Sequence, residues 1–372
     1  MIAVTLPASL LGQSSLFSAR GLGYPGRELS ARAAASGGAF GMFDPQSSVN
    51  PAALGGIDAL TTVFTINHNF MSPENPAGSA STRDTRFPQM MIVGPVQHSG
   101  AALGLSYSNY TSRDFTLAST NTVDLRGVPV GVSDSLQSRG GLADLRLAGA
   151  YRIHDRWVFG GALHILTGSN RLQSRRFFDD PTYLSSTQRA EISYAGLGFS
   201  VGLLRQFGSS FSVGAVARTD GHVNVDQDSS RVAQIDLPYS FGLGLRWHPT
   251  AKLDLGAQGL YHAWSGANSD LLAQGGTGAV NTGQLSVGGE YTPNGRHPSR
   301  WPLRFGGHYA QLPFPLVPGD HPHEIRVSIG TGMRFGQERG GIDLTGEHVW
   351  RSEGTAYSET AFVIGVGVSL RP

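Results

Sequence analysis

The chain has 372 residues, and its 28 lysine and arginine residues balance 27 acidic ones, giving a formal net charge of +1. That balance argues against nucleic acid or a strongly acidic partner, and the cysteine-free sequence excludes disulfides, zinc thiolates and a cysteine nucleophile. Charged residues make up only 15% of the chain, below the usual quarter, while glycine occurs 51 times. A soluble chain of this length would usually divide into about two or three domains, whereas a closed barrel can absorb it in one sheet.

Residues 1–13 begin with a short apolar run that ends in small residues. This pattern is similar to the apolar core of a secretory signal peptide whose basic start is missing. We expect a truncated signal peptide here, with the mature chain beginning near Gln13 or Ser14, and a disordered N-terminus is the alternative. No stretch of the sequence approaches the ~20 consecutive apolar residues of a membrane-spanning helix.

Residues 14–56 are rich in turn-forming residues and show no alternating pattern. FDPQSSVNPAALGG, residues 43–56, cannot be a strand because Pro45 and Pro51 lack the N–H group that a ladder needs. GLGYPG at 21–26 matches G-x-G-x-x-G, but no strand precedes it and no crossover unit follows, so we reject a dinucleotide site. We expect the segment to be irregular and to be held in place by the rest of the protein.

From Ile57 onward, apolar residues alternate with polar or small ones, with the period of two that is typical of β-strands. For example, Leu145 and Leu147 lie on one face of a segment, and Asp144 and Arg146 lie on the other. Turn signals separate 14 such segments: 57–70, 86–97, 100–113, 140–153, 156–170, 188–206, 210–224, 232–247, 252–264, 280–293, 301–312, 322–336, 340–352 and 357–371. We therefore predict an all-β fold, a 14-stranded antiparallel β-barrel over residues 57–372.

Two features favour a transmembrane barrel with its apolar face outward over a soluble sandwich. The positions between the apolar residues are rich in glycine, serine and opposite charges, as in a polar lumen. The five tryptophans fall at or beside predicted strand ends, as in the aromatic girdles of membrane barrels: Trp157, Trp247, Trp264, Trp301 and Trp350.

The predicted connections differ between the two ends of the barrel. Three are tight turns and four are long polar loops, in this order: 154–156, 208–210 and 248–252, then 114–139, 171–187, 265–279 and 313–321. Short turns opposite long loops are typical of outer-membrane barrels. Residues 94–104 place Pro95 in a glycine-rich stretch, which allows an inward kink of a strand or an ordinary turn, and we favour the turn.

One predicted loop carries a candidate site for ligand capture. Arg175 and Arg176 precede Phe177 and Phe178, so the guanidinium groups could bind a carboxylate while the rings contact an alkyl chain. An ordinary loop with a small apolar cluster is the favoured interpretation.

Six charged residues are predicted to face the lumen: Asp144, Arg146, Arg246, Arg304, Asp343 and Glu347. They form either a substrate site or, as we favour, salt bridges that hold the shape of the barrel. HPHE at 321–324 contains metal-ligand residue types, but a solvated loop is the better interpretation, and we expect no metal or other cofactor. We identify no serine in a nucleophile elbow and expect no enzyme activity, with a hydrolase on the barrel wall kept as a minor alternative.

Several motifs together resemble the FadL family of outer-membrane transporters, which includes the TodX-type transporters of aromatic compounds. Residues 14–56 resemble the plug of that family and contain its NPA motif, here Asn50, Pro51 and Ala52, before the first strand. LPYSFGLGLRWHP, LDLGAQGLYHAWS, GGEYTP and LRFGGHYAQLPF are similar to strand motifs of the family, in the same order. The chain departs from the family by ending in LRP, where an aromatic residue is usual.

The resemblance implies a plug, or hatch, that fills the lumen over residues 14–56. It implies passive uptake of hydrophobic small molecules such as long-chain fatty acids, with lateral release into the membrane. The expected setting is the bacterial outer membrane, with a monomer surrounded by outer-membrane lipids and no nucleic acid bound. Two alternatives stay open: a related barrel that acts as a secretion accessory or scaffold for a protein partner, and a general polar porin. The sequence does not name the ligand.

Overall fold

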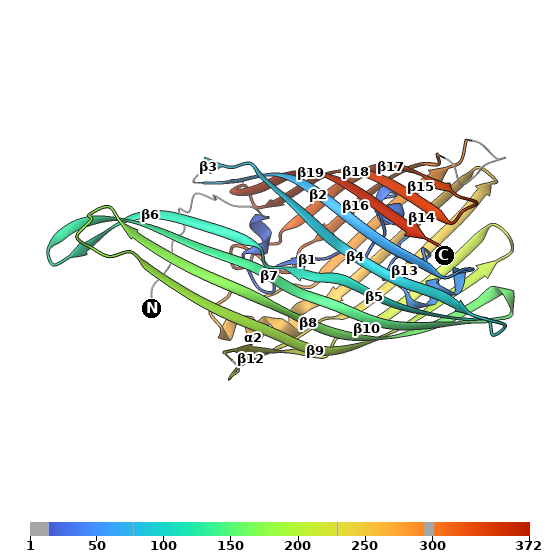
Figure 1. Cartoon of the computed structure of the whole chain (residues 1–372), viewed down its shortest axis with the longest axis horizontal. Helices are drawn as coiled ribbons and strands as arrows, with labels where there is room; N and C mark the ends of the chain where they lie inside the picture. The colour runs from blue at the N-terminus through green and yellow to red at the C-terminus, as the bar shows by residue number, and fades with distance from the viewer. Residues whose placement is uncertain (1–14, 77, 229, 294–300) are drawn as a thin grey trace.

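A computed structural model describes residues 15–76, 78–228, 230–293 and 301–372, and residues 1–14, on which the predicted signal peptide falls, lie outside these ranges. The described chain forms a closed antiparallel β-barrel whose strands run diagonally across the molecule (Figure 1). Hydrogen bonds between the last and the second strand, β19 and β2, close the barrel, with Leu370 opposite Thr62 and Ser358 opposite Glu74. Among the described residues, no helix is long and apolar enough to cross a membrane.

Within the described ranges, fourteen strands make up the barrel wall, which confirms the predicted fold. In order around the wall they are β2 (Thr61–Asn75), β4 (Thr82–Val96), β5 (Ala101–Ser112), β7 (Val128–Ile153), β8 (Trp157–Phe178), β9 (Ser186–Phe207), β10 (Phe211–Thr219), β13 (Tyr239–Thr250), β14 (Leu253–Ala263), β15 (Thr282–Tyr291), β16 (Leu303–Gln311), β17 (His323–Phe335), β18 (Gly340–Glu353) and β19 (Tyr357–Leu370). The shorter elements are η1 (Leu16–Ser18), β1 (Tyr24–Pro25), α1 (Ala31–Ala35), η2 (Pro51–Gly56), β3 (Gly78–Ser79), β6 (Phe115–Leu125), η3 (His154–Arg156), β11 (His222–Gln227), β12 (Ser230–Asp236), η4 (Trp264–Ala267) and α2 (Asn268–Ala273).

The outer face of the wall is apolar and the inner face is polar, as the alternation predicts. On β7, Leu147 and Tyr151 are 57% and 52% exposed, whereas Asp144 and Arg146 are each 1% exposed. The same inversion holds around the barrel, where exposed leucine, isoleucine, valine and aromatic side chains alternate with buried charged and hydroxyl groups. A soluble protein would expose the second set, so the surface is suited to a hydrocarbon environment.

Two predicted loops are instead strands. Residues 114–139 and 171–187 contain β6 and the outer parts of β7, β8 and β9, which pair with each other. This four-stranded ribbon projects beyond the rest of the barrel (Figure 1). The loop prediction was wrong because the ribbon is polar on much of both faces, so its strands lack the apolar alternation by which wall strands are recognised.

The remaining connections follow the prediction more closely. Residues 97–100 form a tight turn between β4 and β5, with Pro95 paired opposite Ala102, so the favoured turn is confirmed and β4 has no kink there. The predicted loop 265–279 contains most of η4 and all of α2, and 313–321 has no regular element.

The tryptophan prediction holds for four of the five side chains. Trp247, Trp301 and Trp350 are between 44% and 56% exposed, and Trp157 stacks on outward-facing Phe159. Trp264 is only 5% exposed and points inward. It was predicted wrongly because a strand end looks the same in sequence whether its aromatic residue faces the membrane or the lumen.

The N-terminal segment, residues 15–56, lies inside the barrel and is mostly buried (Figure 1). Helix α1 begins at a capping serine, Ser30, whose hydroxyl accepts a hydrogen bond from the Ala33 amide. Its alanines fit against bare glycine backbone of the wall, since an added Cβ on Gly330 would lie 2.5 Å from the Cβ of Ala35. Small residues on both surfaces therefore let this helix lie directly against the inner wall.

Candidate functional site

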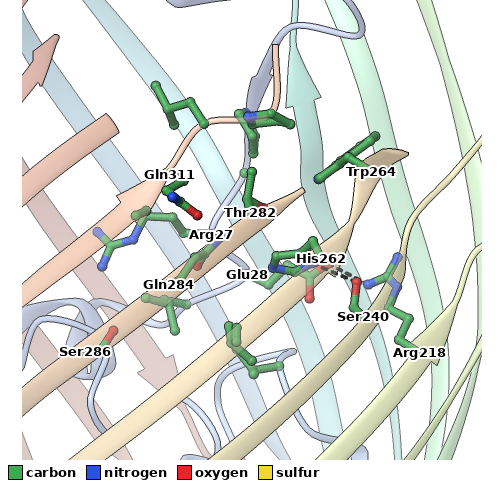
Figure 2. Close-up of a pocket in the computed structure, with 18 of the residues that line it drawn as sticks. Arg27, Glu28, Arg218, Ser240, His262, Trp264, Thr282, Gln284, Ser286 and Gln311 are labelled. Carbon is green, nitrogen blue, oxygen red and sulfur yellow. Dashed lines mark hydrogen bonds and ion pairs between the residues drawn. The ribbon is translucent and has the colours of Figure 1, made fainter. Parts of the chain in front are cut away.

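A cavity of about 130 Å³ separates residues 24–29 of the N-terminal segment from the inner face of β10 and β13–β16 (Figure 2). The wall strands supply its side chains at alternate positions, because every second residue of a strand faces inward. Its lining includes Glu28, Leu29, Val216, Arg218, Ser240, Leu260, His262, Trp264, Thr282, Gln284, Ser286, His308 and Leu312. The cavity is therefore neither wholly polar nor wholly apolar.

Two histidine–serine pairs form the polar side of the cavity. His262 Nδ1 lies 2.7 Å from the hydroxyl of Ser240, and His308 Nδ1 lies 2.9 Å from that of Ser286. Each pair joins residues directly opposite each other on neighbouring strands, so the ladder register fixes their geometry. The pairs present ring edges and hydroxyl groups to the cavity without adding a fixed charge.

Arg218 is the main ionic link between the N-terminal segment and this part of the wall. Its guanidinium group lies 2.8 Å from a carboxylate oxygen of each of Glu28, Asp144 and Asp220. Burial raises the pKa of the Glu28 carboxyl, while the positive charge of Arg218 opposes that rise. Three carboxylates thus share the ion pairs of one buried cation, and removing Arg218 would break all three pairs.

A second ionic cluster anchors Tyr24. Its hydroxyl donates a short hydrogen bond to Glu324 and accepts from Arg326 at 3.3 Å and Arg351 at 3.2 Å. Arg27, three residues on, binds Glu347 through Nη1 at 2.9 Å. The N-terminal segment is therefore tied to β17 and β18 as well as to β10.

The apolar end of the cavity continues into a buried cluster at the mouth of the barrel. The ring of Trp264 meets that of Phe314 edge-on, with centroids 5.0 Å apart and an interplanar angle of 70°. Figure 2 shows Trp264 at the opposite end of the view from Ser286. This cluster, which we call the cap, comprises Leu22, Leu142, Leu166, Tyr194, Val223, Val225, Ile235, Leu237, Trp264, Ala267, Leu271, Ala279 and Phe314.

The outer face of the wall carries an apolar groove behind the cavity. This open depression of about 870 Å³ lies where small outward residues, among them Ala215, Ala217 and Gly259, sit between bulkier ones. Val216 and Leu260 line both the groove and the cavity. Only one layer of small and aliphatic residues therefore separates the lumen from the outer surface here.

The NPA residues form the tight turn that ends the N-terminal segment. The side chain of Asn50 caps η2 by accepting a hydrogen bond from the Ala52 amide at 3.0 Å, and Pro51 occupies the first helical position. The turn rests on glycines of β8 and β9, since a Cβ on Gly202 would lie 1.9 Å from Asn50 Oδ1 and one on Gly160 would lie 2.3 Å from the Ala52 nitrogen.

The six predicted lumen charges are all inside the barrel, but they belong to different clusters, with Glu347 in the cluster around Tyr24. Asp144 joins Arg218 and His164, whereas Arg304 binds Glu290 and Asp343, each at 2.6 Å. Arg246 pairs with Asp254. Arg146 is buried beside Asp144. None of the three guanidinium nitrogens of Arg146 has a hydrogen-bond partner among the described residues.

The predicted capture residues lie on the ribbon, away from the cavity lining. Arg176 forms two 2.7 Å hydrogen bonds with Asp134 on β7, and Phe178 packs against Tyr183. Arg175 is exposed opposite Ser135, and the ring of Phe177 is 49% exposed. Capture of a ligand there remains a prediction.

The sequence did not predict a Ser–His–Asp chain that the structure contains, although residues 198–202 read G-F-S-V-G and match the G-x-S-x-G motif. His164 lies 2.8 Å from the Ser200 hydroxyl and 2.7 Å from Asp144. The motif lies in the middle of β9, not at a strand-to-helix elbow, so the neighbouring amides belong to the ladder. Ser200 is 3% exposed and does not line the cavity, so we interpret the chain as a structural polar network.

Comparison with known proteins gives a match to one sequence family and similarity to several solved structures. A family model described as BamG matches residues 1–210. A search of curated proteins finds no match. Among solved structures, a FadL homologue from Pseudomonas aeruginosa has a TM-score of 0.63 at 15% identity, covering 94% of this chain and 99% of that one.

Two toluene transporters have a similar fold. TbuX from Ralstonia pickettii has a TM-score of 0.61 at 15% identity, covering 92% of this chain and 98% of that one. TodX from Pseudomonas putida also has a TM-score of 0.61 at 15% identity, covering 93% and 98%. At such low identity these likenesses show the shared barrel fold and leave the ligand open.

Proposed function

The chain belongs to the BamG family, and on the basis of its barrel fold and its lumen cavity we propose that it is a bacterial outer-membrane channel for passive uptake of hydrophobic small molecules. The apolar outer face suits the hydrocarbon layer of a membrane, and the polar inner face is filled by the N-terminal segment. The channel acts as a monomer surrounded by outer-membrane lipids, without a cofactor.

The single observation that carries this proposal is the cavity between residues 24–29 and the wall. A polar porin needs an open aqueous lumen, whereas here the N-terminal segment fills much of the barrel and leaves a small cavity with apolar side chains at one end. A ligand would contact Leu29, Leu260 and Trp264 with its apolar part and the histidine–serine pairs with any polar edge. The segment therefore acts as a plug that also forms half of a binding site.

The volume of the cavity bears on the size of the solute. A cavity of about 150 Å³ lined by apolar residues accepts benzene, and this one measures about 130 Å³. The closed space is therefore close in size to a single small aromatic ring, and two structures of similar fold are described as toluene transporters. A long-chain fatty acid is a second candidate, and it requires the plug to shift and enlarge the space.

We place lateral release at the outer groove. Val216 and Leu260 line both the cavity and the groove, so a rotamer change of aliphatic side chains would bring the two spaces into contact. The solute would then pass into the hydrocarbon layer without crossing the polar end of the lumen, where Arg246 and Arg304 lie. This route avoids burying an apolar solute among ion pairs.

A second candidate function is a scaffold or secretion accessory for a protein partner, and the ribbon favours it. Strand β6 pairs with β7 along one edge, and within the described residues no strand pairs with its other edge. An open edge can accept a strand from another protein. The sequence of β6, FTLASTNTVDL, contains no lysine or proline that would block such pairing.

Uptake by intact cells tests the proposed function. Cells of a Gram-negative strain without its own aromatic channel would express the chain and be given radiolabelled toluene, with radiolabelled oleate in a parallel experiment. Faster uptake of toluene than in cells with empty plasmid supports the channel. Uptake of both probes no faster than in cells with empty plasmid, together with a protein that co-purifies only when β6 is intact, would favour the scaffold.

A further inference from the structure

The cap is built on a separable part of the chain that covers the mouth of the barrel. Residues 264–281, which we call the lid, comprise η4, α2 and the turn that leads into β15. The lid contributes Trp264, Ala267, Leu271 and Ala279 to the cap. Since Trp264 also lines the cavity, the lid lies between the cavity and the outside of the barrel.

The lid is held to its surroundings by few bonds. On one side, the backbone amide of Asp236 on β12 donates to Asp270 of α2 at 2.9 Å. On the other, the Val280 amide donates to the carbonyl of Pro313 at 2.9 Å. A third bond runs from the Thr277 hydroxyl of the lid to the Pro315 carbonyl. The lid is not part of the strand ladder, and its other contacts in the cap are apolar packing. A segment that lies outside the strand ladder and is joined to its surroundings by few hydrogen bonds is suited to local opening.

The wall beside the lid is also interrupted. The strand that begins as β10 breaks at Asp220 and Gly221 and continues as β11, and β12 breaks at Leu237 and Pro238 before β13. Gly221 has a φ of +59°, which glycine adopts without strain. The Leu237 amide donates to the Gly221 carbonyl at 2.9 Å, so the two breaks face each other. The β11–β12 hairpin is thus joined to the barrel through a paired bend beside the lid.

We propose that the lid is the access gate of the cavity, and that the contact between Trp264 and Phe314 selects the solute; this inference rests on the proposed uptake function. A solute reaches the cavity when η4 and α2 move away from β12 and the two rings separate. The cap consists of apolar side chains, so an uncharged apolar solute can replace the contacts that it breaks. A carboxylate of the same size would lose its hydration in the cap without gaining a partner there.

The gate therefore assigns a substrate class: small, uncharged, apolar or aromatic molecules. Toluene and benzoate distinguish charge from size, because they differ mainly in the replacement of a methyl group by a carboxylate. The arginines of the ribbon predict the opposite preference, since guanidinium groups favour benzoate. Selection at the cap and capture at Arg175 or Arg176 are thus separable by experiment.

An engineered disulfide tests the gate directly. A Cβ added at Gly266 of η4 would lie 3.8 Å from the Cβ of Asp236 on β12, the separation typical of disulfides. The chain contains no cysteine, so D236C/G266C creates one unambiguous pair. Cells expressing this variant would be given radiolabelled toluene under oxidising conditions and again after reduction, with each single-cysteine variant as the matched control.

The gate predicts that the oxidised double variant loses toluene uptake and that reduction restores it, while oxidation leaves both single variants active. Toluene uptake by the oxidised double variant equal to that after reduction would overturn the gate. If wild-type cells take up no more toluene than cells without the protein, the proposed function fails, and the gate fails with it.

A second measurement checks selection by the aromatic pair. Trp264→Ala and Phe314→Ala are expected to raise benzoate uptake relative to toluene uptake, with Trp350→Ala on the outer face as the control. An unchanged ratio in variants that still migrate as folded barrels would contradict selection at this contact. The disulfide experiment stays decisive if these variants do not fold.

Discussion

The side-chain oxygen of Asn50 lies directly over the bare α-carbon of Gly202, where an added Cβ would approach it to 1.9 Å. Asn50 is fully buried, and the same oxygen caps η2. The Asn50 side chain therefore caps the last turn of the N-terminal segment and also packs against β9. Position 202 must be glycine because a side chain there would overlap the Asn50 oxygen. This contact explains physically why the NPA motif precedes the first wall strand.

Gly202→Ala is expected to displace the NPA turn and loosen the plug. The methyl group cannot occupy the space of Asn50 Oδ1, so the turn must lift from β9, at a cost of about 1–3 kcal/mol. We expect higher ion conductance in planar bilayers with an intact barrel. Gly161→Ala is the matched control, because the nearest atom to its Cβ would be 3.9 Å away. Equal conductance of the two variants would contradict the seating role of Gly202.

Arg218→Met is expected to destabilise the contact between plug and wall strongly. Glu28, Asp144 and Asp220 would lose their shared cation, and breaking a buried ion pair in this way costs about 3–5 kcal/mol. The heat-modifiable shift of the folded barrel on a gel measures the effect, as a lower midpoint temperature. The double variant Arg218→Met/Glu28→Gln should recover part of the loss, because one uncompensated charge has been removed.

The matched control for Arg218 is Arg231→Met. Arg231 pairs with Asp226 at 3.1 Å, but the two side chains are 54% and 30% exposed, so the loss should be about 0–1 kcal/mol. A midpoint as low as that of Arg218→Met would show that charge removal alone, and not the link to the plug, sets the stability.

Filling the outer groove is expected to slow release. Ala215→Trp and Ala217→Trp place large side chains in the depression that separates cavity from membrane, on positions that face outward. Toluene uptake should fall while the barrel keeps its heat-modifiable migration. Ile329→Trp, at an outward position on β17 away from the groove, is the control. Uptake unchanged in both groove variants would exclude this side of the wall as the exit.

Acid is expected to loosen the ribbon. The hydrogen bonds from Arg176 lower the pKa of Asp134 below its ordinary value. The pair therefore contributes its full stability above the ordinary pKa of aspartate, near 4, and loses it as the pH falls through the lowered value. The pair is largely exposed, so its contribution is below about 1 kcal/mol.

Pepsin cleavage near Phe177 and Phe178 measures this effect, because the protease is active across the acid range. As the pH falls below about 4, cleavage should increase in the wild type more than in Arg176→Met, which lacks the pair at every pH. The same pH dependence in both would show that other groups control the ribbon.

The sequence predicts the wall well because the information is local. Inward and outward positions follow from a period of two. Each strand can therefore be recognised from its own residues, such as the adjacent Asp144 and Leu145. The NPA turn is also local, since Asn50, Pro51 and Ala52 carry the cap and the helix start within three residues.

The site was harder to predict because its contacts join distant parts of the chain. Arg218 is 190 positions from Glu28, and nothing in either neighbourhood signals the other. Trp264 packs inward against Phe314, from another connection, and Tyr110, from strand β5. The ribbon was missed for a different reason, because strands outside the hydrocarbon layer need no apolar face.

A crystal structure of the protein soaked with bromobenzene would show whether an apolar solute binds in the lumen cavity, because the bromine scatters anomalously and reports its own position. We expect an anomalous peak inside the barrel, between Leu260 and Trp264 on the wall side and Leu29 on the plug side. Peaks confined to the outer surface and the detergent belt, with the cavity occupied only by water, would contradict it.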